Sequence, residues 1–127
     1  MTGELVLIVE DDERSRRLLR DVLQHDGYRT LEAATAADAL LQAREGLPSL
    51  VVMDIQLPDG DGVTTLGVLR RDPTTSSIPA IAVTAFAMKS DQERFLAAGF
   101  NGYITKPIDL AALRALVTRL VSRTQSL

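Results

Sequence analysis

The chain has 127 residues, of which 46% are apolar and 24% charged, with a formal net charge of −3 at pH 7. This length predicts one domain, residues 1–127, with a full core, and the weak acidity argues against binding to nucleic acid or anionic membranes, which need clustered positive charge. The absence of cysteine excludes disulfides and thiolate chemistry. No apolar run is long enough to span a bilayer, and acids directly follow the first apolar stretch. We therefore expect a cytoplasmic protein without a signal peptide.

The first part of the chain alternates apolar runs with segments of helical periodicity. Leu5–Val9 lacks polar alternation and is predicted to be a strand buried on both faces. A helix follows, with apolar residues on one face at Leu18, Leu19, Val22 and Leu23. Tyr28–Ala33 is a weaker strand candidate, and Ala36–Arg44 is a short predicted helix. Gly27 and Gly46 stand where these helices should end.

The same alternation continues to the end of the chain. Three further strands and two helices between them are predicted, at Leu50–Met53, Gly62–Arg71, Ala80–Val83, Lys89–Ala98 and Gly102–Thr105. The last helix has apolar residues spaced i, i+3, i+4 and i+7, at Leu113, Leu116, Val117 and Leu120. No linker, repeat or low-complexity segment interrupts the pattern.

Five strand–helix units predict an α/β fold, a doubly wound parallel sheet with helices on both faces and right-handed crossovers. This number of units in this length favours the flavodoxin-like (βα)5 arrangement, with strand order 2-1-3-4-5. In that order the functional crevice lies at the carboxyl ends of the first and third strands.

Charged and hydroxyl side chains follow four of the five strands. In chain order they are Glu10, Asp11 and Asp12, then Asp54, Thr84 and Lys106. The carboxyl ends of parallel strands meet at one edge of the sheet, so we expect these side chains to converge. Any one of these residues, taken alone, can be explained by turn chemistry, and capping of the following helix could be the whole role of Asp11 or Asp12. Their joint occurrence at four strand ends favours a functional site.

The chemistry of such a cluster points to phosphoryl transfer. Crowded carboxylates repel one another and recruit a cation, and ligands that are all oxygen favour a hard ion such as Mg²⁺. Asp54, alone on the central strand, could attack phosphorus as a carboxylate nucleophile. Thr84 and Lys106 could then hold the oxygens of the product.

At this point the chain resembles the response-regulator receiver (CheY-like) family over nearly its whole length. The stretches that carry the resemblance are LIVEDDERSRRLL, LVVMDIQLPDGDG and AIAVTAFAMKSDQERFLAAGFNGYITKPI. The resemblance implies that Asp54 is the phosphoacceptor. It also implies that Asp11, Asp54 and the backbone carbonyl of Gln56 ligate Mg²⁺, with Glu10 acting through water.

Further roles follow from the same resemblance. Thr84 is expected to be the switch hydroxyl, Tyr103 the switch aromatic and Lys106 the phosphate-binding lysine, with a cis peptide bond between Lys106 and Pro107. Gln56 and Phe86 are expected to flank the attacking water and so to tune the lifetime of the phosphoryl group. Because Phe86 cannot hydrogen-bond to water, we expect it to slow hydrolysis.

Within the family, the sequence motifs are most similar to those of DivK-type single-domain regulators of bacterial cell-cycle control. Receiver domains of hybrid histidine kinases have closely similar motifs. We expect a histidine kinase or histidine phosphotransferase as donor, and output by binding a downstream protein, because no output domain is present. We further expect a monomer or weak dimer, which catalyses only its own phosphorylation and dephosphorylation. The alternatives are a receiver excised from a hybrid histidine kinase and, with less support, an aspartyl-phosphate phosphatase. A phosphatase of the haloacid-dehalogenase type needs an acid two residues after the nucleophile, where this chain has Gln56.

Overall fold

Five parallel strands form the centre of the molecule. The structure is a computed structural model that describes residues 3–85 and 88–125. The sheet has the order β2-β1-β3-β6-β7. Its strands are, in chain order, β1 Leu5–Val9, β2 Arg29–Ala33, β3 Leu50–Asp54, β6 Ala80–Thr84 and β7 Gly102–Thr105. Counted among the strands of this sheet alone, the order is 2-1-3-4-5, which confirms the prediction.

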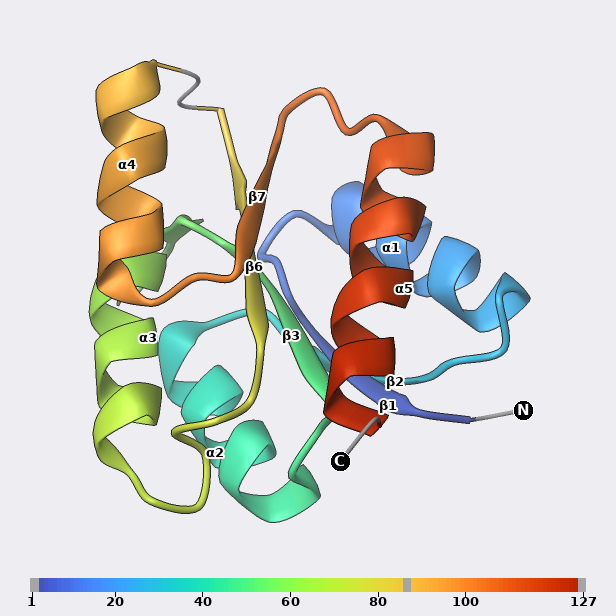
Figure 1. The fold of residues 1–127 in the computed structure, drawn as a ribbon, viewed down its shortest axis with the longest axis horizontal. Coiled ribbons are helices and arrows are strands. Elements are labelled where there is room, and N and C mark those ends of the chain that lie inside the picture. Colours follow the sequence, from blue (N-terminus) through green and yellow to red (C-terminus); the bar gives the residue numbers. More distant parts are fainter. Residues whose placement is uncertain (1–2, 86–87, 126–127) are drawn as a thin grey trace.

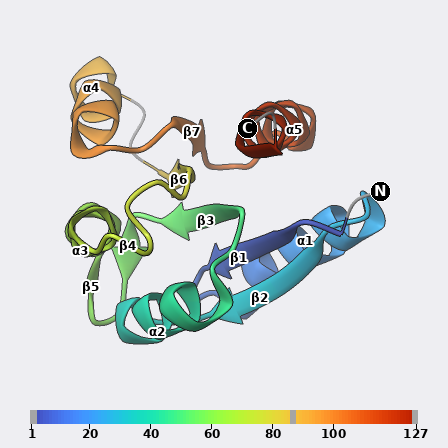
Figure 2. The ribbon, with the colours of Figure 1, turned by 60° about the horizontal axis from the view of Figure 1, so that its bottom comes forward.

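Helices cover both faces of the sheet (Figures 1 and 2). They are α1 Glu13–His25, α2 Ala36–Gly46, α3 Gly62–Arg71, α4 Lys89–Ala98 and α5 Leu110–Gln125. Helices α1 and α5 lie on one face, and α2, α3 and α4 lie on the other. None of the helices in the described ranges combines the length and apolar character that a membrane crossing requires.

The core is divided into two layers by the sheet. Val6 and Ile8 of β1 belong to the layer under α1 and α5, whereas Leu7 and Val9 belong to the layer under α2, α3 and α4. Successive side chains of a strand point to opposite faces, so a strand covered on both faces must be apolar throughout. This explains why the strand sequences show no polar alternation.

One apolar side chain of α1 lies outside the core, contrary to what the sequence pattern indicates. Leu18 of α1 is 43% exposed, so the buried stripe of that helix consists of Leu19, Val22 and Leu23. Met88, which directly precedes the predicted helix Lys89–Ala98, is the N-cap residue of α4 and is 71% exposed. For α1, the periodicity assigns the correct helix but overestimates the width of its buried face.

The segment after β3 contains a feature that the sequence pattern does not reveal. Residues Gln56–Leu57 (β4) and Gly60–Asp61 (β5) pair as a short antiparallel hairpin. Strands of two residues are too short to show a period. Asp59, at the tip of this hairpin, accepts hydrogen bonds from the backbone N–H groups of Ala36 and Ala37 at 2.7 and 3.0 Å. These bonds hold the pKa of Asp59 below its ordinary value and tie the hairpin to the first turn of α2.

Candidate functional site

Four polar residues occupy the carboxyl ends of four neighbouring segments of the sheet. Asp54 and Thr84 are the last residues of β3 and β6, one position beyond the strands expected from the sequence. Glu10 follows β1 and donates its backbone N–H to Ala33 at 3.0 Å. Lys106 follows β7 and donates its backbone N–H to the carbonyl of Thr84 at 2.8 Å. These backbone hydrogen bonds continue the sheet pairing beyond the strand ends, and they bring the four residues to the same edge of the sheet.

The carboxylate of Asp54 is buried and held from two sides. Only 6% of the residue is exposed. Its Oδ1 accepts the backbone N–H of Gln56 at 3.0 Å, and its Oδ2 accepts the Lys106 ammonium at 2.8 Å. A buried carboxylate costs several kcal/mol unless such donors compensate it, so this orientation is fixed by the chain around it.

Glu10 is a buried carboxylate whose charge is incompletely compensated by its neighbours. It is 1% exposed, and its Oε2 accepts the backbone N–H of Asp12 at 3.1 Å. Its Oε1 lies 3.2 Å from the Lys106 ammonium, an ion pair whose direction does not satisfy a hydrogen bond, so within the described residues this atom accepts none. Burial, against the opposing effect of the Asp12 N–H and with the charge of Asp54 adding to it, raises the pKa of Glu10 to about 7.

The ammonium of Lys106 is shared between the two buried carboxylates. Burial by itself lowers the pKa of Lys106, but the hydrogen bond and charge of Asp54, together with Glu10, outweigh burial and raise the pKa above its ordinary value. Lys106 is therefore a firmly charged cation. One ammonium nevertheless faces three carboxylates, because Asp11 also reaches this edge.

The three carboxylates can hold a metal ion. One oxygen each from Glu10, Asp11 and Asp54 lies within 4.8 Å of the others, and Asp11 is exposed at the mouth of the cluster. Oε1 of Glu10 is buried, pairs with the Lys106 ammonium at 3.2 Å and accepts no hydrogen bond within the described residues, so further positive charge would stabilise it. Oxygen donors with an exposed member fit Mg²⁺, which keeps several of its waters. The residues present therefore fit the ion that the sequence predicts.

Two contacts that support this edge could not be foreseen from the sequence. The Arg16 guanidinium donates from Nη1 to the carbonyl of Glu10 at 2.9 Å, bracing the acidic turn from α1. A Cβ on Gly62 would lie 2.8 Å from the carbonyl oxygen of Asp54, so only glycine permits this approach of α3. Such contacts depend on how elements pack, and the local sequence carries no signal for them.

The remaining predicted residues lie around this cluster. Thr84 is buried, and Gln56 is exposed beside Asp54. Tyr103, on β7, donates its hydroxyl to Oε1 of Gln92 on α4 at 2.8 Å, a partner the sequence analysis missed. The predicted cis peptide bond between Lys106 and Pro107 is present. Phe86 lies outside the described residues.

This fold, with an acidic cluster beside a buried aspartate and a lysine, is the combination that the sequence analysis expects of a response-regulator receiver domain. The family profile of the response regulator receiver domain matches residues 6–118, and the chain belongs to this family. The polar-differentiation response regulator DivK of Brucella ovis is 46% identical over 105 residues, which are 83% of this chain and 85% of that protein. The DivK protein of Brucella melitensis matches equally well.

Solved structures agree with this assignment. A putative response regulator from Chloroflexus aurantiacus superposes with a TM-score of 0.90 at 31% identity, covering 95% of this chain and 99% of that one. The receiver domain of a sensor histidine kinase from Pseudomonas aeruginosa has a TM-score of 0.87 at 30% identity, with 95% and 99% covered. The latter holds a magnesium ion coordinated in its active site cleft.

Proposed function

We propose that Asp54 accepts a phosphoryl group from the phosphohistidine of a histidine kinase or histidine phosphotransferase. The observation that carries this proposal is the buried Asp54 carboxylate, oriented by the Gln56 N–H and the Lys106 ammonium beside an acidic cluster. A carboxylate oxygen of Asp54 attacks phosphorus, the bond from phosphorus to the donor imidazole nitrogen breaks, and the imidazole leaves with the electron pair and takes up a proton.

Asp11, Asp54 and the backbone carbonyl of Gln56 would hold Mg²⁺, with Glu10 acting through a bound water. When bound, the ion neutralises the charge that develops on the phosphoryl oxygens. Glu10 and Asp54 together with Asp11 carry more negative charge than Lys106 balances, which favours binding of a divalent cation. The role of this chain is thus to orient the nucleophile and to supply oxygen ligands.

Lys106 and Thr84 would hold the transferred group. Lys106 already contacts Oδ2 of Asp54, so its ammonium is placed to donate to a phosphoryl oxygen bound at that carboxylate. Thr84 ends the neighbouring strand β6, in register with Thr105 of β7. A shift of the Thr84 hydroxyl toward the phosphoryl group would change the space beside Tyr103 and shift the population of the two states.

The signal would leave the domain by binding another protein. The relatives named DivK are response regulators of polar differentiation, which supports a role in bacterial cell-cycle or division control. In this role the domain catalyses only its own phosphorylation and dephosphorylation, and it acts as a monomer or weak dimer. A phosphatase activity gains no support, since the position two residues after Asp54 is Gln56.

The proposal is tested by phosphorylation with acetyl phosphate and Mg²⁺, followed by mass spectrometry of the intact protein. Wild type should gain one phosphoryl group, and Asp54→Asn should gain none. Asp59→Asn is the matched control, because Asp59 is an exposed acid close in sequence whose hydrogen bonds go to α2. It should be labelled like wild type. Undiminished labelling of Asp54→Asn would show that the phosphoacceptor is another residue.

A further inference from the structure

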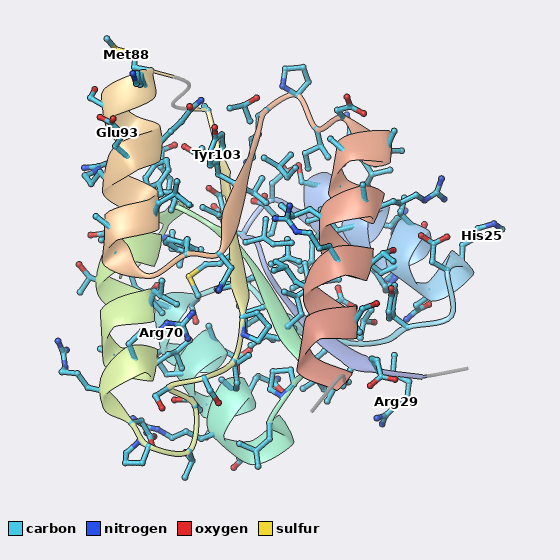
Figure 3. The ribbon with its side chains drawn as sticks, in the orientation of Figure 1. His25, Arg29, Arg70, Met88, Glu93 and Tyr103 are labelled. Atoms are coloured by element: carbon cyan, nitrogen blue, oxygen red, sulfur yellow. The ribbon has the colours of Figure 1, made fainter. Side chains whose placement is uncertain are left out.

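The side chain of Tyr103 is held by helix α4. Its hydroxyl donates a 2.8 Å hydrogen bond to Oε1 of Gln92, and its ring is partly buried against the core layer under α2, α3 and α4. Figure 3 shows Tyr103 between β7 and α4, whereas Glu93, the next residue after Gln92, lies on the outer side of the helix. The ring is therefore tied by a side-chain bond as well as by packing.

Strand register places the ring next to Thr84. Tyr103 pairs with Ala82 of β6, and Thr84 follows Ala82 by two residues, so the side chains of Thr84 and Tyr103 project from the same face of the sheet. Neighbouring strands lie about 4.8 Å apart and residues two positions apart on a strand about 6.6 Å apart, so such diagonal neighbours lie within reach of an aromatic side chain. Under the proposed function the ring moves toward Thr84, and because this movement takes the hydroxyl away from Gln92, the hydrogen bond belongs to the described arrangement only.

Helix α4 is fastened unequally along its length. Near its C-terminal end Phe95 is fully buried and meets Phe100 edge to face, with ring centroids 6.3 Å apart. Arg70 also donates to the carbonyl of Gly99 at 2.9 Å. At the other end Met88, the N-cap residue, makes no side-chain capping bond. Gln92 lies between these ends, so its bond to Tyr103 ties the less secured half of α4 to β7.

We propose that Gln92 is a positioning residue of the switch, which holds Tyr103 in the described arrangement and thereby sets how often the other arrangement is populated before phosphorylation. The inference rests on the proposed function, in which Tyr103 is the switch aromatic. A ligand that selects the other arrangement must bind against this hydrogen bond. Removing the bond therefore raises the apparent affinity for such a ligand without touching the phosphorylation site.

The probe is beryllofluoride with Mg²⁺, which imitates a phosphoryl group on a carboxylate. Gln92→Leu keeps the size of the side chain but removes the acceptor. It should lower the apparent Kd for beryllofluoride about fivefold, the fold-change equivalent to one hydrogen bond of about 1 kcal/mol. In a Tyr103→Phe background, which lacks the hydroxyl, the same change of Gln92 should leave the Kd unchanged. Glu93→Gln is the matched control on α4 and should also leave it unchanged.

A spectroscopic readout reports on Tyr103 itself. The chain contains two tyrosines and no tryptophan, so fluorotyrosine labelling gives two fluorine NMR resonances, and Tyr28→Phe assigns them. Without beryllofluoride, Gln92→Leu should move the Tyr103 resonance toward the position that wild type reaches when saturated. Glu93→Gln should leave the resonance in place.

The outcomes separate the two proposals. If wild type responds to beryllofluoride but Gln92→Leu has the wild-type resonance and the wild-type Kd, the positioning role is wrong. The same holds if Gln92→Leu lowers the Kd equally in the Tyr103→Phe background, because the effect then does not pass through the hydroxyl. If wild type itself binds no beryllofluoride, the proposed function fails and this inference fails with it.

Discussion

Glu10 makes the stability of the metal-free domain fall as the pH rises. The burial that raises the pKa of Glu10 to about 7 disfavours its charged form in the folded protein, whereas the unfolded chain titrates near the ordinary value of 4.5. Below both values the carboxyl is neutral in both states. Between them the folded state retains a proton that the unfolded state loses, so stability decreases until the pH passes about 7.

The size of the effect follows from the same two values. A difference between 4.5 and about 7 corresponds to up to about 3 kcal/mol of lost stability at high pH. Glu10→Gln imitates the protonated side chain and cannot become charged. In EDTA this variant should match wild type at about pH 4.5 and exceed its free energy of unfolding by up to about 3 kcal/mol at about pH 8.

Urea unfolding monitored by circular dichroism measures this difference. Comparing variant and wild type at each pH cancels the contributions of titrating groups that do not contact Glu10. At about pH 8, Mg²⁺ should stabilise wild type and reduce the advantage of Glu10→Gln. A difference between Glu10→Gln and wild type that stays the same at both pH values would refute the reasoning.

Three other outcomes are expected. Thr84→Ala should accept phosphate from acetyl phosphate as wild type does but bind the downstream partner weakly; full partner binding by the phosphorylated variant in a pull-down would contradict the coupling. Gly62→Ala should lower the free energy of unfolding by about 1–3 kcal/mol in urea titrations, because its Cβ would lie 2.8 Å from the Asp54 carbonyl, whereas Gly67→Ala, which meets only the Arg71 side chain at 3.8 Å, should not destabilise. Wild type should keep its phosphoryl group for many minutes to hours, and Phe86→Ala and Phe86→Glu should lose it severalfold faster in a phosphate-release time course; equal rates would mean that Phe86 does not gate the water.

Strand and helix positions were predictable from the sequence because each is a local pattern. The run Leu50–Met53 is buried on both faces, and the positions of the five strands and helices are confirmed with ends shifted by a few residues. The convergence of Glu10, Asp54 and Lys106 was predictable as well, since parallel strands bring their carboxyl ends together. Here the fold itself converts distant sequence positions into neighbours.

Contacts between side chains of different elements could not be predicted in this way. That Gln92 accepts from Tyr103, or that Gly62 must be glycine, depends on the exact approach of a helix to the sheet. The hairpin of residues 56–61 was missed because its strands have two residues each. Leu18 shows the opposite limit, since a residue that fits the periodic pattern remains exposed at the margin of the buried face.

The sheet also divides the residues of the site into two groups, according to the face on which their side chains lie. Glu10, Asp54 and Lys106 continue the alternation of the residues that face α1 and α5, whereas Thr84 and Tyr103 continue that of the opposite face. We therefore expect that substitutions around Tyr103 on the α4 side alter the response to phosphorylation while the carboxylates and the lysine on the other side of the sheet stay in place. Proteins with this arrangement can change the targets that they bind while keeping the residues that accept the phosphoryl group.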